Sequence, residues 1–593
     1  MSDTPRGFQT MVPMRDGTRL NTFVFLPEGG PRSPVILHRT PYGIAAADAR
    51  DRFDIAHAWL PNPAEPMRGS ILRGWRAIVA HGYAAVYQDT RGRNGSEGED
   101  RVYADDAADG YDTLEWISGQ EWSNGRVGIS GSSAGATTTF AAASTRHPSL
   151  RAFFAQAGGS SIYDDVVYEG QSIEMERLWL WVAKNIPGLS PSHREMARQR
   201  SGLDAAAFAA AAAAAAARYE RLDAARLVDP PFIDSPDWLS LPLAGYPDFA
   251  TWQPFLDEIV SHPAPDTFRA AHNFRRTIDI PGFHVTTWFD IFQTSVIAAF
   301  QDIQARTGTQ KLWVGPNEHY FVYASNFWPR DPYFDWFGYW LKDAPTDLID
   351  RPAVAYSPRA WVADRAAYRP DDWRDAERWP PPGVRPRRLY LQGDGSLSSD
   401  AAGGGMRRYE YDPRHPIPSL GGRNMLIDAG PRDQRPAQAL PNYGLIYRGT
   451  ALFEPLTVAG NVRAVLHVGS DCRDTDFIVK LVELLPDGCA MLLMDGVVRA
   501  MYRDGGSEPQ YLQPDRVCRV DIDLGDIHHT FAAGSCIEID VTSSNFPRRA
   551  RNTNSGNPVL ANDCDGDIRI AVNTVHHGAA TLSYVELPVL KGV

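Results

Sequence analysis

The sequence predicts an α/β fold that is interrupted by a helical insertion and followed by an all-β domain. Three observations support this fold class. Short apolar runs alternate with helical patterns over residues 1–155 and again over 276–350, which is typical of a mostly parallel sheet. Strand signals fade over 156–275, where helical patterns dominate. From 385 to 593, short alternating segments separated by Gly, Asp, Asn and Pro turns indicate strands only.

Length and composition are those of a soluble globular protein with several structural units. The chain has 593 residues, 43% hydrophobic and 22% charged, and at roughly 100–200 residues per domain it corresponds to about three or four units. Its net charge of −13, from 59 basic and 72 acidic residues, argues against a nucleic-acid binder. Because no apolar run reaches about 18 residues, no membrane span is predicted.

The first α/β stretch begins with a hairpin. Asp16-Gly17 is a turn signal between the apolar segments 11–14 and 20–26. Short apolar runs then indicate buried strands, and apolar residues at helical spacing indicate helices. The further elements predicted here are, in chain order, strands at 34–37 and 84–87, a helix over 105–118, a strand at Val127 and a helix over 134–143.

The insertion over 156–275 is predicted to cover the upper edge of the sheet as a cap. It contains 205–217, a run of alanine interrupted only by Phe208, and alanine is the best helix former. Caps of this kind shape substrate pockets and exclude water.

After the insertion, the chain returns to α/β and then changes to β-structure. Strands are predicted at 280–286 and 311–315, and an aromatic helix at 334–341. The Pro- and Arg-rich segment 351–384 is interpreted as a linker. The region 385–593 is predicted to form a sandwich or jelly roll.

The cysteines and the N-terminus predict the compartment. All five cysteines lie in the last quarter of the chain, their number is odd, and no CxxC pair occurs, so free thiols in a reducing compartment are expected. The first residues do not have the pattern of a secretory signal. A cytoplasmic location is therefore predicted.

Ser133 lies in the motif Gly131-Ser132-Ser133-Ala134-Gly135, directly after a predicted strand and before a predicted helix. In such a motif the glycines leave room for a sharp turn that exposes the serine hydroxyl at the top of a sheet. A hydroxyl is a poor nucleophile until a base takes its proton. The motif therefore predicts catalysis only if the chain also supplies a histidine and a carboxylate.

Candidates for both partners follow in the chain. Asp290 comes just after the strand at 280–286, and His319 comes just after the strand at 311–315. In α/β-hydrolases the triad appears in the order serine, acid, histidine, which is the order here. Because open α/β sheets bind ligands at the carboxyl ends of their strands, we expect these side chains to meet Ser133 there.

The residues around these candidates resemble a known family over nearly the whole chain. The chain is similar to the cocaine esterase-like and Xaa-Pro dipeptidyl-peptidase-like (CocE/NonD) serine hydrolases, which include α-amino-acid ester hydrolases and glutaryl-cephalosporin acylases. The matching motifs are residues 14–20, 39–42, 88–98 and 122–128 before the elbow, and 433–436, 474–477, 486–488 and 544–548 in the last domain.

The resemblance implies a cofactor-free and metal-free serine hydrolase with an α/β-hydrolase core, a helical cap and a β jelly roll. It implies Ser133 as nucleophile, Asp290 as acid and His319 as base. It further implies that the hydroxyl of Tyr42 and the backbone N–H of Ala134 form the oxyanion hole. The family usually has tyrosine at the position of Ala134, so a wider pocket is expected there, although the backbone donor remains.

The substrate pocket is the part that the resemblance predicts least closely. Amino-ester hydrolases of the family hold an ammonium group with acidic residues, some of them two and three positions after the triad acid, where this chain has Phe292 and Gln293. Phe292 instead matches an aromatic wall of the cocaine esterase-like acyl pocket. Trp288 and cap aromatics such as Trp181 are candidates to join it, and Asp165 resembles the other contributor to the acidic cluster.

The sequence therefore predicts a serine esterase whose partner is a small-molecule ester or amide, and predicts neither nucleic acid nor a membrane as partner. It leaves homo-oligomerisation open. An acylase, an amidase or an Xaa-Pro dipeptidyl-peptidase is the alternative within enzymes. A ligand-binding protein that has kept only the hydrolase shell is a more remote alternative, and it would be expected to have a broken triad.

Overall fold

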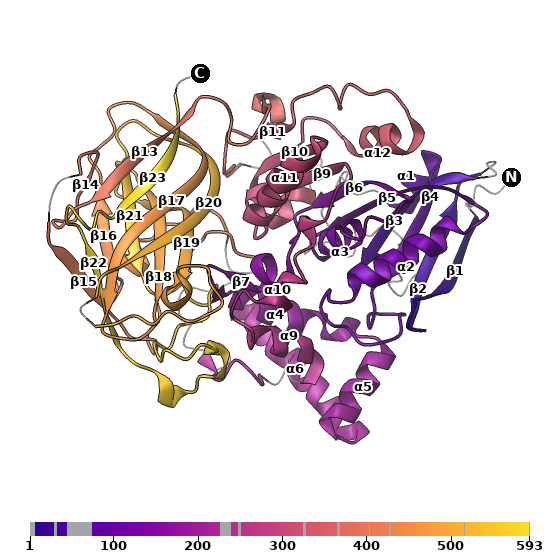
Figure 1. Cartoon of the computed structure of the whole chain (residues 1–593), viewed down its shortest axis with the longest axis horizontal. Helices are drawn as coiled ribbons and strands as arrows, with labels where there is room; N and C mark the ends of the chain where they lie inside the picture. The colour runs from indigo at the N-terminus through magenta and orange to yellow at the C-terminus, as the bar shows by residue number, and fades with distance from the viewer. Residues whose placement is uncertain are drawn as a thin grey trace.

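A computed structural model gives the arrangement of most of the chain. It describes residues 6–28, 32–43, 74–225, 239–246, 251–323, 328–364, 368–401, 404–425, 429–514 and 516–591. Figure 1 shows a sheet of early strands on one side, a β-rich C-terminal part on the other, and a group of helices below and between them. Parts of the predicted ranges, such as 44–73 and 226–238, lie outside the described residues.

The α/β part is built on one ten-stranded sheet in the order β1-β2-β4-β3-β5-β6-β9-β10-β11-β12. Strands β4 to β11 pair in parallel, whereas β1, β2 and β12 pair antiparallel at the two ends. The bounds are β1 (Arg6–Pro13), β2 (Arg19–Leu26), β3 (Ser33–Thr40), β4 (Ala84–Asp89), β5 (Ser123–Ser132), β6 (Leu150–Gln156), β9 (Gly282–Phe289), β10 (Gln310–Glu318), β11 (Val354–Tyr356) and β12 (Arg374–Ala376).

Both faces of this sheet are covered. On β3, Val35 and Leu37 belong to one hydrophobic cluster, and Ile36 belongs to another on the opposite face, because successive side chains of a strand alternate. The first cluster includes Phe140 of α3, and the second includes Trp336 of α12. The flanking helices are α1 (Trp75–Ala80), α2 (Asp106–Ser118), α3 (Ala134–Ala143), α11 (Gln293–Thr307) and α12 (Tyr333–Lys342). The α/β fold class predicted from the sequence is confirmed.

The segment 351–384, which the sequence predicts to be a linker, contains strands in the structure. This segment contributes β11 and β12, so it extends the sheet by two edge strands. Each is only three residues long. A three-residue strand is too short to show an alternating pattern, and these two are stabilised by pairing with β10 and with each other.

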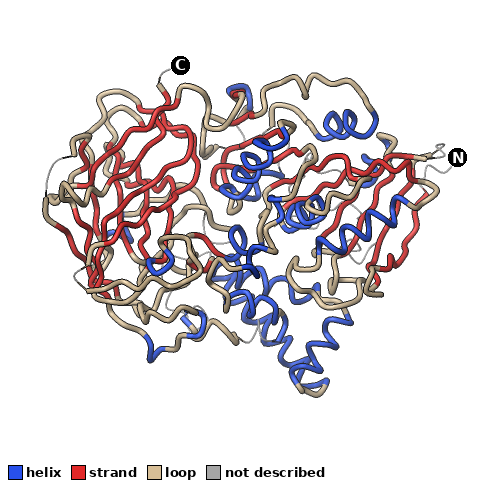
Figure 2. The backbone as a smooth tube through the Cα atoms, viewed as in Figure 1, coloured by secondary structure: helices blue, strands red, loops and turns tan. Residues whose placement is uncertain are grey.

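The insertion is mainly helical, as the sequence predicts (Figure 2). The alanine-rich run forms part of one long helix, in which Phe208 and Ala215 pack with Trp252 and Leu189. Its elements are η2 (Ile162–Val167), β7 (Tyr168–Glu169), β8 (Ser172–Ile173), α4 (Met175–Asn185), η3 (Ile186–Gly188), α5 (Pro191–Ser201), α6 (Ala205–Ala225), α9 (Pro254–Val260), α10 (Thr267–Ala270) and η5 (Phe274–Arg276). Within the described ranges, none of the helices has the length and apolar character that a membrane crossing requires.

The C-terminal part consists of two facing β-sheets. One has seven strands, in the order β14-β13-β23-β17-β22-β15 with β20 paired to β17, and the other has the order β16-β21-β18-β19. The bounds are β13 (Val384–Leu391), β14 (Leu397–Ser398), β15 (Met406–Tyr411), β16 (Leu445–Arg448), β17 (Leu456–Ser470), β18 (Asp476–Leu484), β19 (Ala490–Arg499), β20 (Cys518–Phe531), β21 (Cys536–Thr542), β22 (Ala571–His576) and β23 (Tyr584–Leu590). This is the all-β domain that the sequence predicts.

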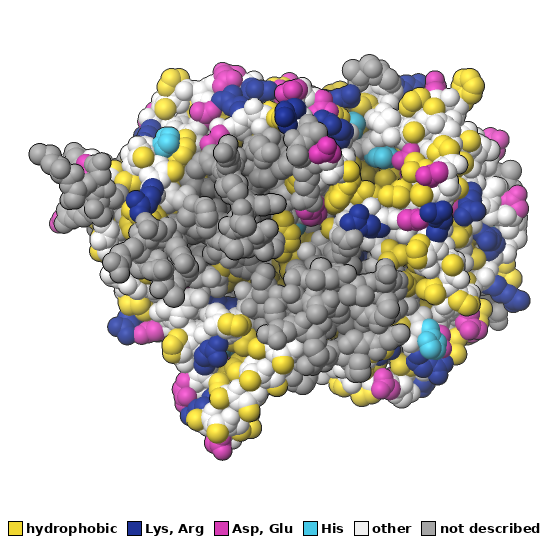
Figure 3. All heavy atoms as spheres, turned by 180° about the vertical axis from the view of Figure 1, so that it is seen from behind, with side chains coloured by type: hydrophobic (Ala, Val, Ile, Leu, Met, Phe, Trp, Pro, Cys, Tyr) yellow, Lys and Arg dark blue, Asp and Glu magenta, His cyan; other side chains and the backbone are white. Residues whose placement is uncertain are grey.

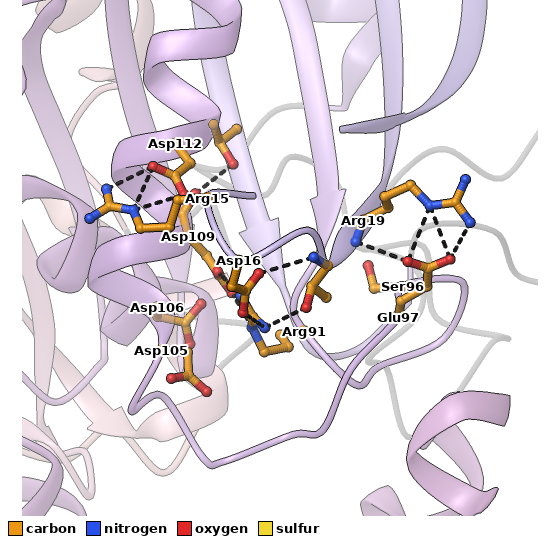
Figure 4. A network of polar contacts seen from close by, with 12 residues as sticks. Arg15, Asp16, Arg19, Arg91, Ser96, Glu97, Asp105, Asp106, Asp109 and Asp112 are labelled. Atoms are coloured by element: carbon orange, nitrogen blue, oxygen red, sulfur yellow. Dashed lines mark hydrogen bonds and ion pairs between the residues drawn. The ribbon is translucent and has the colours of Figure 1, made fainter. Parts of the chain in front are cut away.

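A network of ion pairs fastens the N-terminal hairpin to α2 (Figure 4). Arg15 pairs with Asp112 at 2.7 Å, while Arg91 pairs with both Asp109 and Asp16 at 2.6 Å. Arg15 and Asp16 belong to the first family-like motif of the sequence, and Arg91 belongs to a later one. These motif residues therefore connect the N-terminal hairpin and the segment after β4 with α2.

Charges of both signs are distributed over the surface seen from behind. Figure 3 shows Lys and Arg side chains interspersed with Asp and Glu across the described part of this face, with hydrophobic side chains between them. The net charge of −13 is therefore not gathered into one acidic patch on this part of the surface.

Asp526 is a buried carboxyl at the contact between the all-β domain and the α/β part. It is 7% exposed, it accepts a hydrogen bond of 2.6 Å from the indole N–H of Trp379, and its backbone carbonyl accepts one from Gln293. Burial is the main cause that raises the pKa of Asp526 to about 6. Because a carboxyl buried in this way favours its neutral form, the fold becomes less stable as the pH rises from about 4 to about 6.

We expect Asp526→Asn to raise the melting temperature relative to the native protein, and the difference to grow with pH. The free-energy cost of ionising this carboxyl in the folded state is absent below about pH 4, where the group is protonated in both states, and nearly complete above about pH 6. At pH 8 the gain corresponds to up to about 3 kcal/mol. Thermal denaturation at pH 5 and pH 8 measures it. Asp521→Asn, an exposed position on the same strand, is the control, and an equal trend in both variants would contradict the expectation.

Candidate active site

Ser133 stands on a sharp turn between β5 and α3. Its backbone has φ 53° and ψ −124°, which is strained for a residue with a side chain. Glycines make the turn sterically possible, because a Cβ on Gly131 would lie 2.0 Å from the carbonyl oxygen of Gly135, and one on Gly158 would lie 2.6 Å from that of Ser133. The strand, turn and helix have the arrangement of a nucleophile elbow.

Asp290 and His319 come from neighbouring strands. Asp290 directly follows β9, and His319 directly follows β10. The Nδ1 atom of His319 lies 2.7 Å from Oδ1 of Asp290, and its Nε2 atom lies 3.2 Å from Oγ of Ser133. The structure thus brings the three sequence-predicted side chains into one hydrogen-bonded series, although 186 positions separate Ser133 from His319.

Asp290 is fully buried and held from two sides. Its Oδ2 atom accepts a hydrogen bond of 2.8 Å from the hydroxyl of Thr286, and Oδ1 accepts one of 3.2 Å from the backbone N–H of Phe292. A carboxylate fixed in this way keeps the proton of His319 on Nδ1. In this tautomer the Nε2 atom can accept the proton of the Ser133 hydroxyl.

Tyr42 and Ala134, the predicted oxyanion-hole residues, lie beside the serine. The hydroxyl of Tyr42 lies 3.5 Å from Oγ of Ser133 and accepts a hydrogen bond of 3.4 Å from the indole N–H of Trp181. Burial raises the pKa of Tyr42, while its contacts with Ser133, Trp181 and the backbone N–H of Ala134 act in the opposite direction. The phenol therefore stays protonated at neutral pH, and two donors converge next to Ser133.

A cavity opens above Ser133, Tyr42 and Ala134, with about 420 Å³ of empty space, part of it open to solvent. Its walls come from three parts of the chain: Phe292 follows β9, Leu178 lies in the insertion, and Met425 belongs to the C-terminal part. The walls are mostly apolar and aromatic, which is typical of a small-molecule pocket. Among the described residues that line it, Arg177 alone carries a formal charge.

Of the pocket residues predicted from the sequence, Phe292 and Trp181 line the cavity, and Trp288 lies elsewhere. Trp288 is 2% exposed, and its indole N–H donates a hydrogen bond of 2.9 Å to the carbonyl oxygen of Ser357. Its ring packs against Trp379 at 5.2 Å between centroids. Trp288, predicted as a pocket residue, thus packs inside the core and is not among the residues that line this cavity.

Asp165 also lies outside the cavity lining. Its Oδ2 atom accepts hydrogen bonds from the backbone N–H groups of Ser160 and Ser161 and from the hydroxyl of Ser295, at 2.6–2.8 Å. Its Oδ1 atom lies 3.6 Å from a guanidinium nitrogen of Arg275. This carboxylate, predicted as a pocket residue, is already hydrogen-bonded within the fold.

The sequence interpretation missed two residues of the cavity wall. Arg177 precedes Trp181 by four positions on α4, so helical spacing places both on one face. Because Trp181 was a pocket candidate, that spacing could have identified Arg177. Met425 lies in an irregular segment of the all-β domain and has no local signal that could have identified it.

Two family profiles together match most of the chain. The profile of the X-Pro dipeptidyl-peptidase (S15 family) matches residues 16–321, and that of the X-Pro dipeptidyl-peptidase C-terminal non-catalytic domain matches 352–586. The cocaine esterase of Rhodococcus sp. (strain MB1 Bresler) is 32% identical to the chain over 608 residues, which cover 98% of each protein.

Solved structures with low sequence identity share the fold. An aminopeptidase from the marine sediment archaeon Thaumarchaeota archaeon has a TM-score of 0.72 at 23% identity, covering 100% of this chain and 99% of that one. An α-amino acid ester hydrolase also has a TM-score of 0.72 at 23% identity, with 98% and 96% covered. Together with the family profiles and the 32% identity, these findings confirm the resemblance noted in the sequence: the chain belongs to the X-Pro dipeptidyl-peptidase (S15) family of serine hydrolases.

Proposed function

We propose that this protein hydrolyses small carboxylic esters through an acyl-enzyme formed on Ser133. His319 acts as general base and then as general acid, and Asp290 orients its imidazole and stabilises the imidazolium. The hydroxyl of Tyr42 and the N–H of Ala134 stabilise the oxyanion. The observation that carries the proposal is the hydrogen-bonded series from Ser133 through His319 to Asp290, at 3.2 and 2.7 Å.

The chemistry follows from this geometry. Nε2 of His319 takes the hydroxyl proton while Oγ of Ser133 attacks the ester carbonyl, and the tetrahedral oxyanion forms between Tyr42 and Ala134. His319 then returns the proton to the departing alcohol, and the acyl group stays on Ser133. Water, deprotonated by His319, attacks the acyl-enzyme in a second round of the same steps and releases the carboxylic acid.

The charge of the pocket favours esters over substrates with a free amino group. X-Pro dipeptidyl-peptidase and amino-ester hydrolase activity both require a site for an ammonium group. The one formal charge among the described cavity-lining residues is the cation of Arg177, which repels an ammonium, and the carboxylate of Asp165 is already occupied by hydrogen bonds.

We expect p-nitrophenyl butyrate to be hydrolysed with a kcat/KM on the order of 100-fold or more above that of the p-nitroanilide of the same acid. The anilide has the poorer leaving group and depends more strongly on proton transfer from His319, a contribution of about 10²–10⁴-fold. Alanyl-prolyl p-nitroanilide, with its free amine, serves as the comparison for dipeptidyl-peptidase activity. Faster cleavage of this dipeptide than of the ester would replace the esterase proposal by the peptidase alternative.

A further inference from the structure

We propose that Arg177 determines substrate specificity by binding a carboxylate of the substrate, so that the preferred substrates are esters that also carry a negative charge. The inference rests on the proposed function, because it places this charged subsite in the cavity above Ser133. Neutral esters would still be cleaved, since Arg177 is not part of the hydrogen-bonded series of Ser133, His319 and Asp290.

The guanidinium of Arg177 is buried but incompletely bonded. The residue is 6% exposed, lines the cavity, and donates one hydrogen bond of 3.1 Å from Nη1 to the carbonyl oxygen of Ile291. Its Nε atom is buried and has no hydrogen-bond partner among the described residues. A guanidinium offers five N–H donors in a rigid fork, and leaving one of them buried without a partner costs free energy. A ligand in the cavity that accepts hydrogen bonds from the guanidinium of Arg177 would offset part of the cost of its burial.

The charge of Arg177 is also only partly compensated. Its Nη2 atom lies 3.9 Å from Oε2 of Glu174. The same carboxylate binds Arg549 at 2.5 Å through Oε1 and lies 3.8 Å from Nε of Arg548. Glu174 therefore lies closest to a guanidinium other than that of Arg177, while Arg548 and Arg549 also pair with Asp495 and Glu169.

The nearby carboxylates do not fully offset the effect of burial on the pKa of Arg177. Burial lowers its pKa, while Glu174, Glu169 and Glu176 raise it and Arg548 lowers it further; the net direction is downward. Glu169 itself pairs with Arg548 and other arginines of the all-β domain. A buried cation in this state gains from an anionic ligand.

Arg177 lies close to the proposed reacting atoms, with the ring of Phe292 in contact with both Arg177 and His319. Cζ of Arg177 lies 5.2 Å from the centroid of the Phe292 ring, and that ring lies 5.9 Å from the imidazole of His319. One phenyl ring thus separates the cation from the proposed base. A carboxylate bound to Arg177 would lie a few bonds from an ester carbonyl at Ser133, and the rest of the wall is apolar enough to hold the connecting chain.

The test compares esters that differ only in charge. On the acyl side, the pair is p-nitrophenyl hemiadipate and its neutral amide, p-nitrophenyl adipamate. On the alcohol side, the pair is 3-(4-acetoxyphenyl)propanoate and 3-(4-acetoxyphenyl)propanamide. We expect the charged member of at least one pair to have the higher kcat/KM. Because Arg177→Met removes a hydrogen bond between charged groups, it is expected to lower kcat/KM for the charged ester about 10- to 100-fold. Little change is expected for the neutral ester.

Two further variants separate charge from shape. Arg177→Lys keeps a cation at this position and is expected to retain part of the preference for the charged ester. Leu178→Met changes the shape of the same cavity wall without changing its charge, and is expected to leave that preference intact. If Arg177→Met lowered kcat/KM equally for charged and neutral esters, Arg177 would only support the fold, and the inference would be overturned. Should that variant fail to fold, a wild-type enzyme without preference in either pair overturns it equally. Absence of all ester hydrolysis would instead refute the proposed function.

Discussion

Ser133→Ala is expected to abolish covalent labelling by a fluorophosphonate probe and to lower kcat for p-nitrophenyl esters by about 10⁴- to 10⁶-fold. The probe reacts with a serine whose proton is taken by a base, and Oγ of Ser133 lies 3.2 Å from Nε2 of His319. Without Oγ, neither the adduct nor the acyl-enzyme can form. Activity-gel labelling and stopped-assay kinetics measure the two effects.

Ser132→Ala is the matched control, because it removes a hydroxyl from the neighbouring residue and leaves the proposed series of side chains intact. It is expected to be labelled, with the adduct mapped to Ser133 by peptide mass spectrometry. Wild-type labelling in Ser133→Ala, or an adduct on another residue, would show that the nucleophile lies elsewhere.

Tyr42→Phe is expected to lower kcat about 100- to 1,000-fold with little change in KM. The substitution removes the hydroxyl that lies 3.5 Å from Oγ of Ser133 and leaves the ring in place. Because the oxyanion exists only in the transition state and the tetrahedral intermediate, the lost hydrogen bond affects the rate and hardly affects substrate binding. Steady-state kinetics with p-nitrophenyl butyrate separate kcat from KM.

Tyr163→Phe serves as its control. Tyr163 is fully buried in the insertion, and its hydroxyl has no hydrogen-bond partner among the described residues. Loss of this hydroxyl is expected to leave kcat near the wild-type value. If Tyr42→Phe raised KM and left kcat unchanged, Tyr42 would contribute to substrate binding and the oxyanion assignment would be wrong.

Much of the fold could be predicted because its signals are local. The helix predicted over 134–143 has the bounds of α3, and the predicted strands at 34–37 and 84–87 lie within β3 and β4. Periodicity and turn residues specify such elements without reference to the rest of the chain. Strands β11 and β12 could not be predicted, because they are too short to have a pattern of their own. They are strands only because they pair with β10 and with each other.

The sequence specifies the triad candidates more closely than the pocket, for a physical reason. Ser133, Asp290 and His319 each follow a strand in the parallel part of the same sheet, and the carboxyl ends of such strands meet at one edge. No comparable rule predicts where the side chains of Trp288, Asp165 and Arg177 lie. Whether each side chain faces the cavity depends on how the insertion and the all-β domain pack against the sheet.

The sequence by itself determined the α/β order, the helical insertion, the all-β domain and the family, because these follow from local patterns and motifs. It also supplied Ser133, Asp290 and His319 in the order that the fold requires. Only the tertiary structure decided that the side chains of Trp288 and Asp165 make internal contacts, and that Arg177 and Met425 line the cavity. Burial and hydrogen bonding are properties of the packed molecule, and they decide which polar groups remain available to a substrate.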